Sequence, residues 1–233
     1  MKLIMQAIDL FSVSGRTSQA ASLAKDCAEK LEEDYNYEDA LKFFEKASQL
    51  YEIENSVSYS NQMLAKWADL SVITEDKKQF AKIIKTYDKI GKKYLSQPLI
   101  KSSAKDYFFK VCLCFLANND MPGAKRSIEN YTYEDPNFDT SKQKDLLDDI
   151  VRAIDIGDGM ELAKCIGKYS QTWQLDKVTV KLLADIKKKH AADPETVGDV
   201  MRKELNLIDG GDDHDDEEID SSKKGPKGGF DLT

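Results

Sequence analysis

The chain has 233 residues, with 34 Lys and Arg against 42 Asp and Glu, which gives a formal net charge of −8. Residues 209–233 hold nine of the acids and three lysines, so they carry −6 of that charge and the preceding residues carry −2. A nearly neutral body can still bear basic and acidic faces that the total hides. The body is also poor in glycine and proline, the residues that most often break helices.

The composition argues against a membrane-spanning, secreted or zinc-binding protein. No apolar run approaches the roughly 18 residues that a spanning helix needs. The opening MKLIMQAIDLF is too short and too soon polar for a secretory signal. The four cysteines form no CxxC pair and there are only two histidines, so no tetrahedral metal site is expected. We therefore expect a cytoplasmic protein whose cysteines are small core residues.

Apolar residues recur at helical spacing through the first half of the chain. Residues 37–51, for example, place Ala40, Phe44, Ala47 and Tyr51 on one stripe. The same pattern predicts helices over residues 2–13, 17–34, 57–72, 80–90 and 101–118. No segment alternates with a period of two over the length of a strand. The sequence therefore predicts an all-α fold.

These helices also repeat. Ala40, Ala81 and Ala124 each open a helix after a short polar break, at spacings of 41 and 43 residues. A helix pair with a small residue at its close approach, recurring at such a spacing, is typical of an α-solenoid whose pairs are somewhat longer than tetratricopeptide repeats. We predict a right-handed solenoid of such helix pairs over residues 1–118.

The later helices do not keep this period, so we predict a C-terminal helical bundle over residues 119–207. A loop at Asp135–Asp139 separates its first two helices, and Asp139, Thr140 or Ser141 can cap the second. The expected helices cover residues 119–135, 142–156, 160–169, 176–190 and 194–207. Residues 208–233 are charged and poor in apolar side chains, and we expect them to form a disordered acidic tail.

The sequence contains none of the motifs of nucleotide-binding loops, zinc proteases or serine hydrolases. Neighbouring acids such as Asp148 and Asp149 are ordinary solvated helix positions. We therefore expect a protein-binding molecule that is not an enzyme, needs no cofactor or metal, and binds no nucleic acid.

One segment resembles a known family. SQPLIKSSAKDYFFKVCLCF, residues 96–115, is similar to the corresponding segment of the alpha-SNAP family, the soluble attachment proteins for the AAA ATPase NSF. The similarity extends upstream through SGRTSQAASLAKDCAEKLEEDYNYEDALKFFEKASQLYE and downstream through DMPGAKRSIENYTYEDPNF to QLDKVTVKLLADIKKK. It covers residues 3–190, with SAKDYFFK as the most specific motif. Family members begin earlier, so the chain is expected to lack their N-terminal helix pairs and the apolar loop that touches the membrane.

The resemblance implies a non-enzymatic adaptor. Family members wrap the SNARE bundle with a basic concave face and recruit NSF at their C-terminal end, so that ATP hydrolysis disassembles the SNARE complex after membrane fusion. It implies a cytoplasmic protein of vesicle traffic, peripherally associated with membranes through SNAREs. The alternative is a helical-repeat scaffold, or a shortened member that binds SNAREs or other partners without driving disassembly.

The resemblance also assigns residues. Toward the SNARE complex it implies Arg16, Lys66, Lys105 and Lys142, whereas two further family lysines fall on Ser22 and Gln62. Toward NSF it implies Asp120, Asp155 and the penultimate Leu232. Three family acids fall on Arg152, Asp155 and Ile156, so only one charge is kept, and we expect the acidic tail to supply the missing negative potential.

Overall fold

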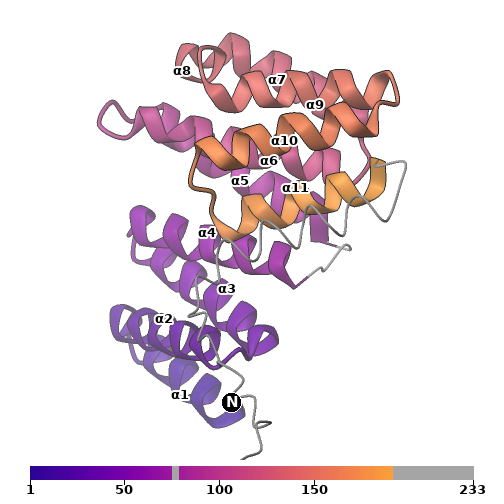
Figure 1. Cartoon of the computed structure of the whole chain (residues 1–233). Helices are drawn as coiled ribbons and strands as arrows, with labels where there is room; N and C mark the ends of the chain where they lie inside the picture. Colours follow the sequence, from indigo (N-terminus) through magenta and orange to yellow (C-terminus); the bar gives the residue numbers. More distant parts are fainter. Residues whose placement is uncertain (75–78, 191–233) are drawn as a thin grey trace, which may run out of the picture. The chain divides into compact units, whose positions relative to one another are not determined.

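The computed structural model describes residues 1–74 and 79–190, and these residues are all-α (Figure 1). The α-helices are α1 (Lys2–Val13), α2 (Thr17–Glu33), α3 (Tyr37–Ile53), α4 (Val57–Ile73), α5 (Phe80–Leu95), α6 (Ala104–Ala117), α7 (Met121–Glu134), α8 (Pro136–Asp139), α9 (Lys142–Asp155), α10 (Gly159–Thr172) and α11 (Lys177–His190), and the 3-10 turn η2 (Lys101–Ser103) precedes α6. Within the described ranges no helix is long and apolar enough to cross a bilayer. The predicted all-α class is confirmed.

Most predicted helices agree with the observed bounds to within the usual uncertainty of helix ends. The predicted loop at residues 135–139 is wrong, because it contains the short helix α8. Asp135 caps it by accepting a hydrogen bond from the Asn137 amide at 3.1 Å, and Pro136 occupies the first helical position. Ser141 is the residue that caps α9. The predicted helix at 194–207 and the tail lie outside the described residues.

Five connections between helices use the same three-residue turn, in which the middle residue has a left-handed backbone. These middle residues are Gly15, Tyr35, Asn55, Asn119 and Gly157, with φ between 56° and 76°. The amide of the next residue donates to a carbonyl five residues back, as from Asp120 to Phe115 at 2.9 Å. So short a turn makes the two helices antiparallel neighbours.

Small residues let the helices approach one another closely. The α2–α3 contact is lined by fully buried alanines, including Ala24, Ala28 and Ala40. Ala40 and Ala124 are buried, as residues at a close contact between helices must be. Ala81 is exposed, so the prediction that it lies at such a contact is wrong. In the α5–α6 pair Gly91 takes that place, because a Cβ there would lie 2.7 Å from Cε1 of Phe108.

Ion pairs link the helix pair α1–α2 to α3–α4, and α3–α4 to α5–α6. In each of these ion pairs the acid belongs to the earlier helix pair and the lysine to the later one. They are Asp9–Lys46, Glu32–Lys66, Glu45–Lys82, Glu52–Lys89 and Asp69–Lys110, with distances of 2.7 to 3.7 Å. The pair Lys125–Asp155, between α7 and α9, has the opposite order. The change of order lies where the sequence repeat is also lost.

A network around the largely buried side chain of Lys110 fixes α11 against the earlier helices. Lys110 Nζ lies 2.9 Å from Asp69 Oδ1 and 3.4 Å from Asp176 Oδ2, and the Tyr87 hydroxyl donates to Asp69 at 2.6 Å. Burial alone would lower the pKa of Lys110, but the two carboxylates outweigh it and raise that pKa. At the other end of α11 Lys189 donates to the carbonyl of Ala117. Both ends of α11 are therefore held in place.

This network generates a prediction about stability. Lys110→Met leaves Asp69 without its cation, and we expect the free energy of unfolding to fall by about 2–4 kcal/mol. Urea unfolding followed by circular dichroism measures the change. The matched control is Lys42→Met, which removes only the exposed pair with Asp39 and should change stability by less than about 1 kcal/mol. Equal effects of the two substitutions would contradict the role of the network.

Candidate protein-binding site

The residues predicted to face the SNARE complex lie on four helices. Arg16 is the N-cap of α2, Lys66 lies in α4, Lys105 in the first turn of α6, and Lys142 is the first residue of α9. The structure brings two of them together, because Gln143 Nε2 donates to Asp106 Oδ1 at 2.6 Å and these residues directly follow Lys142 and Lys105. Within the described ranges, no hydrogen bond or ion pair joins Arg16 or Lys66 to these residues.

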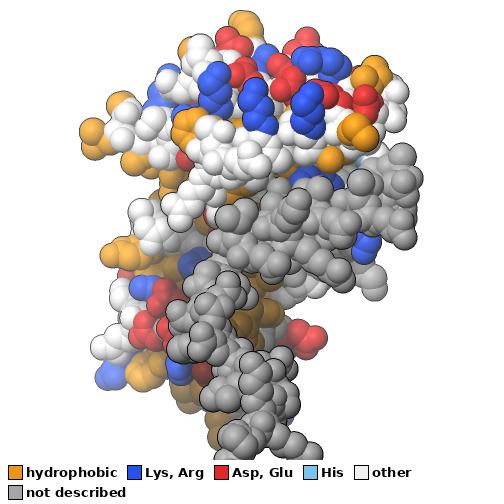
Figure 2. All heavy atoms as spheres, viewed as in Figure 1, with side chains coloured by type: hydrophobic (Ala, Val, Ile, Leu, Met, Phe, Trp, Pro, Cys, Tyr) orange, Lys and Arg blue, Asp and Glu red, His pale blue; other side chains and the backbone are white. Residues whose placement is uncertain are grey.

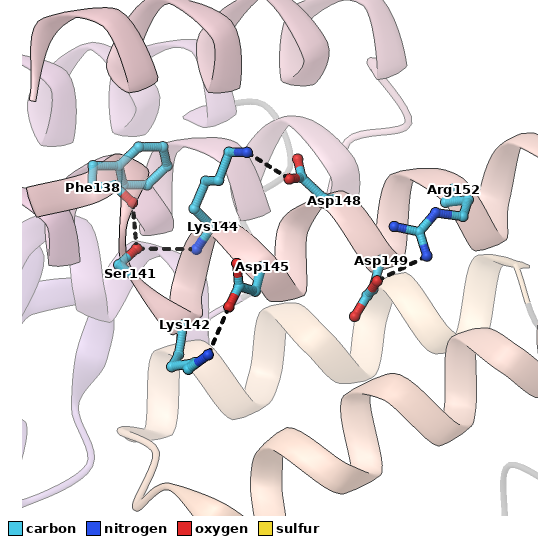
Figure 3. A network of polar contacts seen from close by, with 8 residues as sticks. All are labelled: Phe138, Ser141, Lys142, Lys144, Asp145, Asp148, Asp149 and Arg152. Atoms are coloured by element: carbon cyan, nitrogen blue, oxygen red, sulfur yellow. Dashed lines mark hydrogen bonds and ion pairs between the residues drawn. The ribbon is translucent and has the colours of Figure 1, made fainter. Parts of the chain in front are cut away.

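The four positive charges are not equally available. Lys66 is paired with Glu32 at 3.1 Å and Lys142 with Asp145 at 3.0 Å (Figure 3). Across residues 1–74 and 79–190, Arg16 and Lys105 form no ion pair. Arg16 and Lys105 therefore carry the least compensated charges of the predicted set.

The structure adds a candidate that the sequence analysis missed. Leu99, in the connection between α5 and α6, is 97% exposed. It lies between Lys93 and Lys101, which form no ion pair with the described residues. The sequence does contain a sign of a basic surface here, since residues 89–105 include five lysines and no acid. An exposed leucine among uncompensated lysines suits contact with an acidic partner that also has apolar side chains.

Two of the three residues predicted to face NSF, Asp120 and Asp155, lie at one edge of the later helices. Asp120 is the N-cap of α7 and accepts a hydrogen bond from the Gly123 amide at 2.8 Å. Asp155, near the end of α9, is paired with Lys125 of α7 at 2.7 Å. That pair joins the beginning of α7 to the end of α9, so Asp120 and Asp155 lie near the same edge. Leu232 lies outside the described residues.

Some of the acids at this edge are paired with cations, whereas Asp120 and Asp158 accept hydrogen bonds from backbone amides and form no ion pair with the described residues. Besides the Asp155–Lys125 pair, Arg152 binds Asp149 at 3.1 Å (Figure 3). Ile156, where the family has an acid, is 67% exposed. Figure 2 shows basic and acidic side chains interleaved over the α9 and α10 end of the visible face. The edge therefore offers an exposed isoleucine, two ion pairs and the unpaired carboxylates of Asp120 and Asp158.

The cysteines and acids give no support for a metal centre or a nucleophile. In the parts of the chain that the structure describes, no group of His, Cys, Asp and Glu could hold a metal ion. Cys112 and Cys114 are buried, and burial raises the pKa of both thiols, while burial raises the pKa of Cys165 to about 11. These thiols stay protonated at neutral pH and act as small core side chains.

The structural and binding roles of Asp120 can be separated. Asp120→Ala removes the cap of α7, and we expect it to cost about 1 kcal/mol of stability. Asp120→Asn keeps a capping oxygen and removes only the charge, so stability should stay within a few tenths of a kcal/mol. Thermal unfolding of both variants checks this. An Asn variant as unstable as the Ala variant would show that the charge, not the cap, matters to the fold.

Asp106 predicts a pH dependence. Burial raises the pKa of its carboxyl above the usual value. Between the pKa values of the unfolded and the folded state, the folded state therefore binds more protons. Protonation of this group thus stabilises the fold, and its contribution to stability rises as the pH falls through that interval. Asp106→Asn removes the titration and keeps an acceptor for Gln143. We expect the variant to be more stable than the unmodified chain at pH 7 and to lose that advantage below about pH 4. Urea unfolding at both pH values measures it, and a constant difference would contradict the assignment.

Comparison with known proteins places the whole described part of the chain in one family. The family model for the soluble NSF attachment protein, SNAP, matches residues 1–191. The chain is 30% identical over 187 residues to the vesicular-fusion protein SEC17 of Komagataella phaffii, which covers 80% of this chain and 63% of that protein. It is 31% identical to the alpha-soluble NSF attachment protein of Saccharomyces cerevisiae over 182 residues (78% of this chain, 61% of the relative).

The human alpha-soluble NSF attachment protein is 31% identical over 193 residues, which is 82% of this chain and 64% of the human protein. The chain thus spans a little over three fifths of the length of the curated relatives it matches. The family model nevertheless spans every described helix, from α1 to α11, and the sequence resemblance is confirmed. The chain belongs to the soluble NSF attachment protein family.

Proposed function

We propose that this protein is a non-enzymatic adaptor that binds assembled SNARE complexes and recruits and stimulates NSF for their disassembly in vesicle traffic. The observation that carries the proposal is the family match over residues 1–191, which includes all the predicted site residues except Leu232. The protein would act in the cytoplasm, peripherally associated with membranes through its SNARE partners.

The SNARE-facing surface in this proposal works by many weak contacts. Each exposed lysine–carboxylate pair contributes only about 0–1 kcal/mol, so Arg16, Lys66, Lys105 and Lys142 must act together. Their attraction for an acidic helical bundle is screened by salt. Leu99 adds apolar contact beside the uncompensated lysines. The helix pairs of residues 1–118 would hold most of this surface.

The ATPase-facing surface would lie on the C-terminal bundle of residues 119–207, at the edge that contains Asp120 and Asp155. Leu232 would act separately, because an apolar side chain near the chain end can fill a pocket of the ATPase and stimulate it without adding much affinity. The pairing of Asp155 with Lys125 and the replacement of family acids by Arg152 and Ile156 favour a second candidate: a family member that binds SNAREs without driving disassembly.

A disassembly assay with purified SNARE complex, NSF and ATP tests the proposal. We expect the unmodified chain to support disassembly, and Leu232→Ala to abolish stimulation of the ATPase while SNARE binding survives. Lys105→Glu should weaken SNARE binding several-fold at low salt, because it reverses a charge that forms no ion pair with the described residues. The matched control is Lys30→Glu, an exposed lysine of α2 that is paired with Glu33 and Asp34.

Two results would change the conclusion. If SNARE complexes bind the unmodified chain but stay intact, the disassembly role fails and the binding-only candidate takes its place. If Leu232→Ala removes SNARE binding and ATPase stimulation equally, the separate role of Leu232 is wrong.

A further inference from the structure

An exposed tryptophan lies on the side of the described unit where one helix ends and three others begin. Trp173 follows the last residue of α10 and is 49% exposed, whereas the other tryptophan, Trp67, is 2% exposed. Figure 1 shows the starts of α6, α9 and α11 on the same side as the end of α10. A half-exposed tryptophan on a folded surface is the type of residue that anchors protein interfaces.

The surroundings of Trp173 are rigid. Its ring centroid lies 6.5 Å from that of Tyr169, whose ring lies 6.2 Å from that of Phe109 in α6. The Trp173 amide donates to the Tyr169 carbonyl at 3.0 Å. Three residues further on, Asp176 binds Lys110 of α6 and accepts a hydrogen bond from the Thr179 amide at 2.7 Å. The chain that carries Trp173 is therefore held to α6 on both sides of the turn.

Each helix that starts on this side of the described unit has a lysine in its first turn: Lys105 in α6, Lys142 in α9 and Lys177 in α11. Phe109, whose ring centroid lies 6.2 Å from that of Tyr169, follows Lys105 by about one turn of α6. The next residue after Lys105, Asp106, binds Gln143 of α9, so Lys105 and Lys142 belong to the same region. Lys177 follows Asp176 in the first turn of α11. Neither Lys105 nor Lys177 forms an ion pair within residues 1–74 and 79–190. We call Lys105, Lys142, Trp173 and Lys177 the Trp173 patch.

We propose that the Trp173 patch is a binding site for an acidic helical protein, with Trp173 as its apolar anchor and Lys105 and Lys177 as its charge contacts. The inference rests on the proposed function, since the acidic helical partner there is the SNARE bundle. It adds two residues, Trp173 and Lys177, that the family resemblance does not assign. An aromatic anchor with uncompensated lysines beside it matches a helix that presents one apolar side chain between acids.

The charges and the polar neighbours of Trp173 favour a protein helix over a lipid surface. Asp106, Asp145 and Asp176 lie among the lysines, and a uniformly anionic membrane would be repelled by these carboxylates. The side chains next to Trp173 in the sequence, Thr172 and Gln174, are polar, so little apolar area is available for insertion between lipids. A helix with discrete acidic positions can instead avoid the carboxylates.

The test measures binding of the full chain to a preassembled SNARE bundle without its membrane anchors. We expect Trp173→Ala to weaken binding about tenfold or more and Trp173→Phe to keep most of it, since the ring is the anchor. Lys177→Glu should weaken binding several-fold at low salt and less at high salt. The matched control is Met160→Ala at the opposite end of α10, where the side chain is 80% exposed, and its affinity should not change. Circular dichroism establishes that each variant folds.

Fluorescence gives a second readout. Because Trp67 is buried, acrylamide quenching of the unmodified chain minus that of Trp173→Ala reports on Trp173. The SNARE bundle should reduce this quenching, and vesicles of phosphatidylcholine and phosphatidylserine should not. Protection by the vesicles alone would overturn the proposal in favour of a lipid site. If binding of the SNARE bundle survives Trp173→Ala but is lost in Lys105→Glu, this inference is wrong and the proposed function stands. If the unmodified chain does not bind the SNARE bundle, both this inference and the proposed function are wrong.

Discussion

The three-residue turn with a left-handed middle residue is the constraint on which the arrangement of helices depends. It reverses the chain in the shortest space that still satisfies the last carbonyls of one helix and begins the next. Glycine and asparagine adopt this backbone at little cost, and Tyr35 does so at the second turn. Because the turn is only three residues long, each helix that follows one must pack against its predecessor. Such close packing requires small side chains, which is why alanines are buried at the α2–α3 contact.

The same turns place candidate binding residues. Arg16 and Asp120 immediately follow left-handed residues, so their positions are set by backbone hydrogen bonds rather than by side-chain packing. The C-terminal helices add a second means of placement. Lys110, Asp176 and Lys189 hold α11 at both ends, and the Gln143–Asp106 hydrogen bond joins α6 to α9. Basic side chains from distant parts of the sequence thereby come to one region.

Much of the fold could be predicted from the sequence, because helical periodicity and caps are local. Asp135 and Pro136 also signal a helix start locally, although a single helical turn is too short for periodicity to detect. The exposure of Ala81 could not be predicted, since the spacing of alanines does not fix the phase in which α5 packs. The approach of Lys105 to Lys142 depends on tertiary contacts. The pairing of Lys66 with Glu32 does as well, and it lowers the charge that the sequence alone assigns to that position.

The ordered ion pairs of α1 to α6 give the helix stack a direction. The middle helix pair, α3 and α4, offers ammonium groups to the helix pair that precedes it and carboxylates to the one that follows, so both junctions have the same charge pattern. A second copy of such a helix pair, inserted in the same orientation, would meet complementary charges at both new junctions. An inverted copy would place its carboxylates next to the carboxylates of its neighbour.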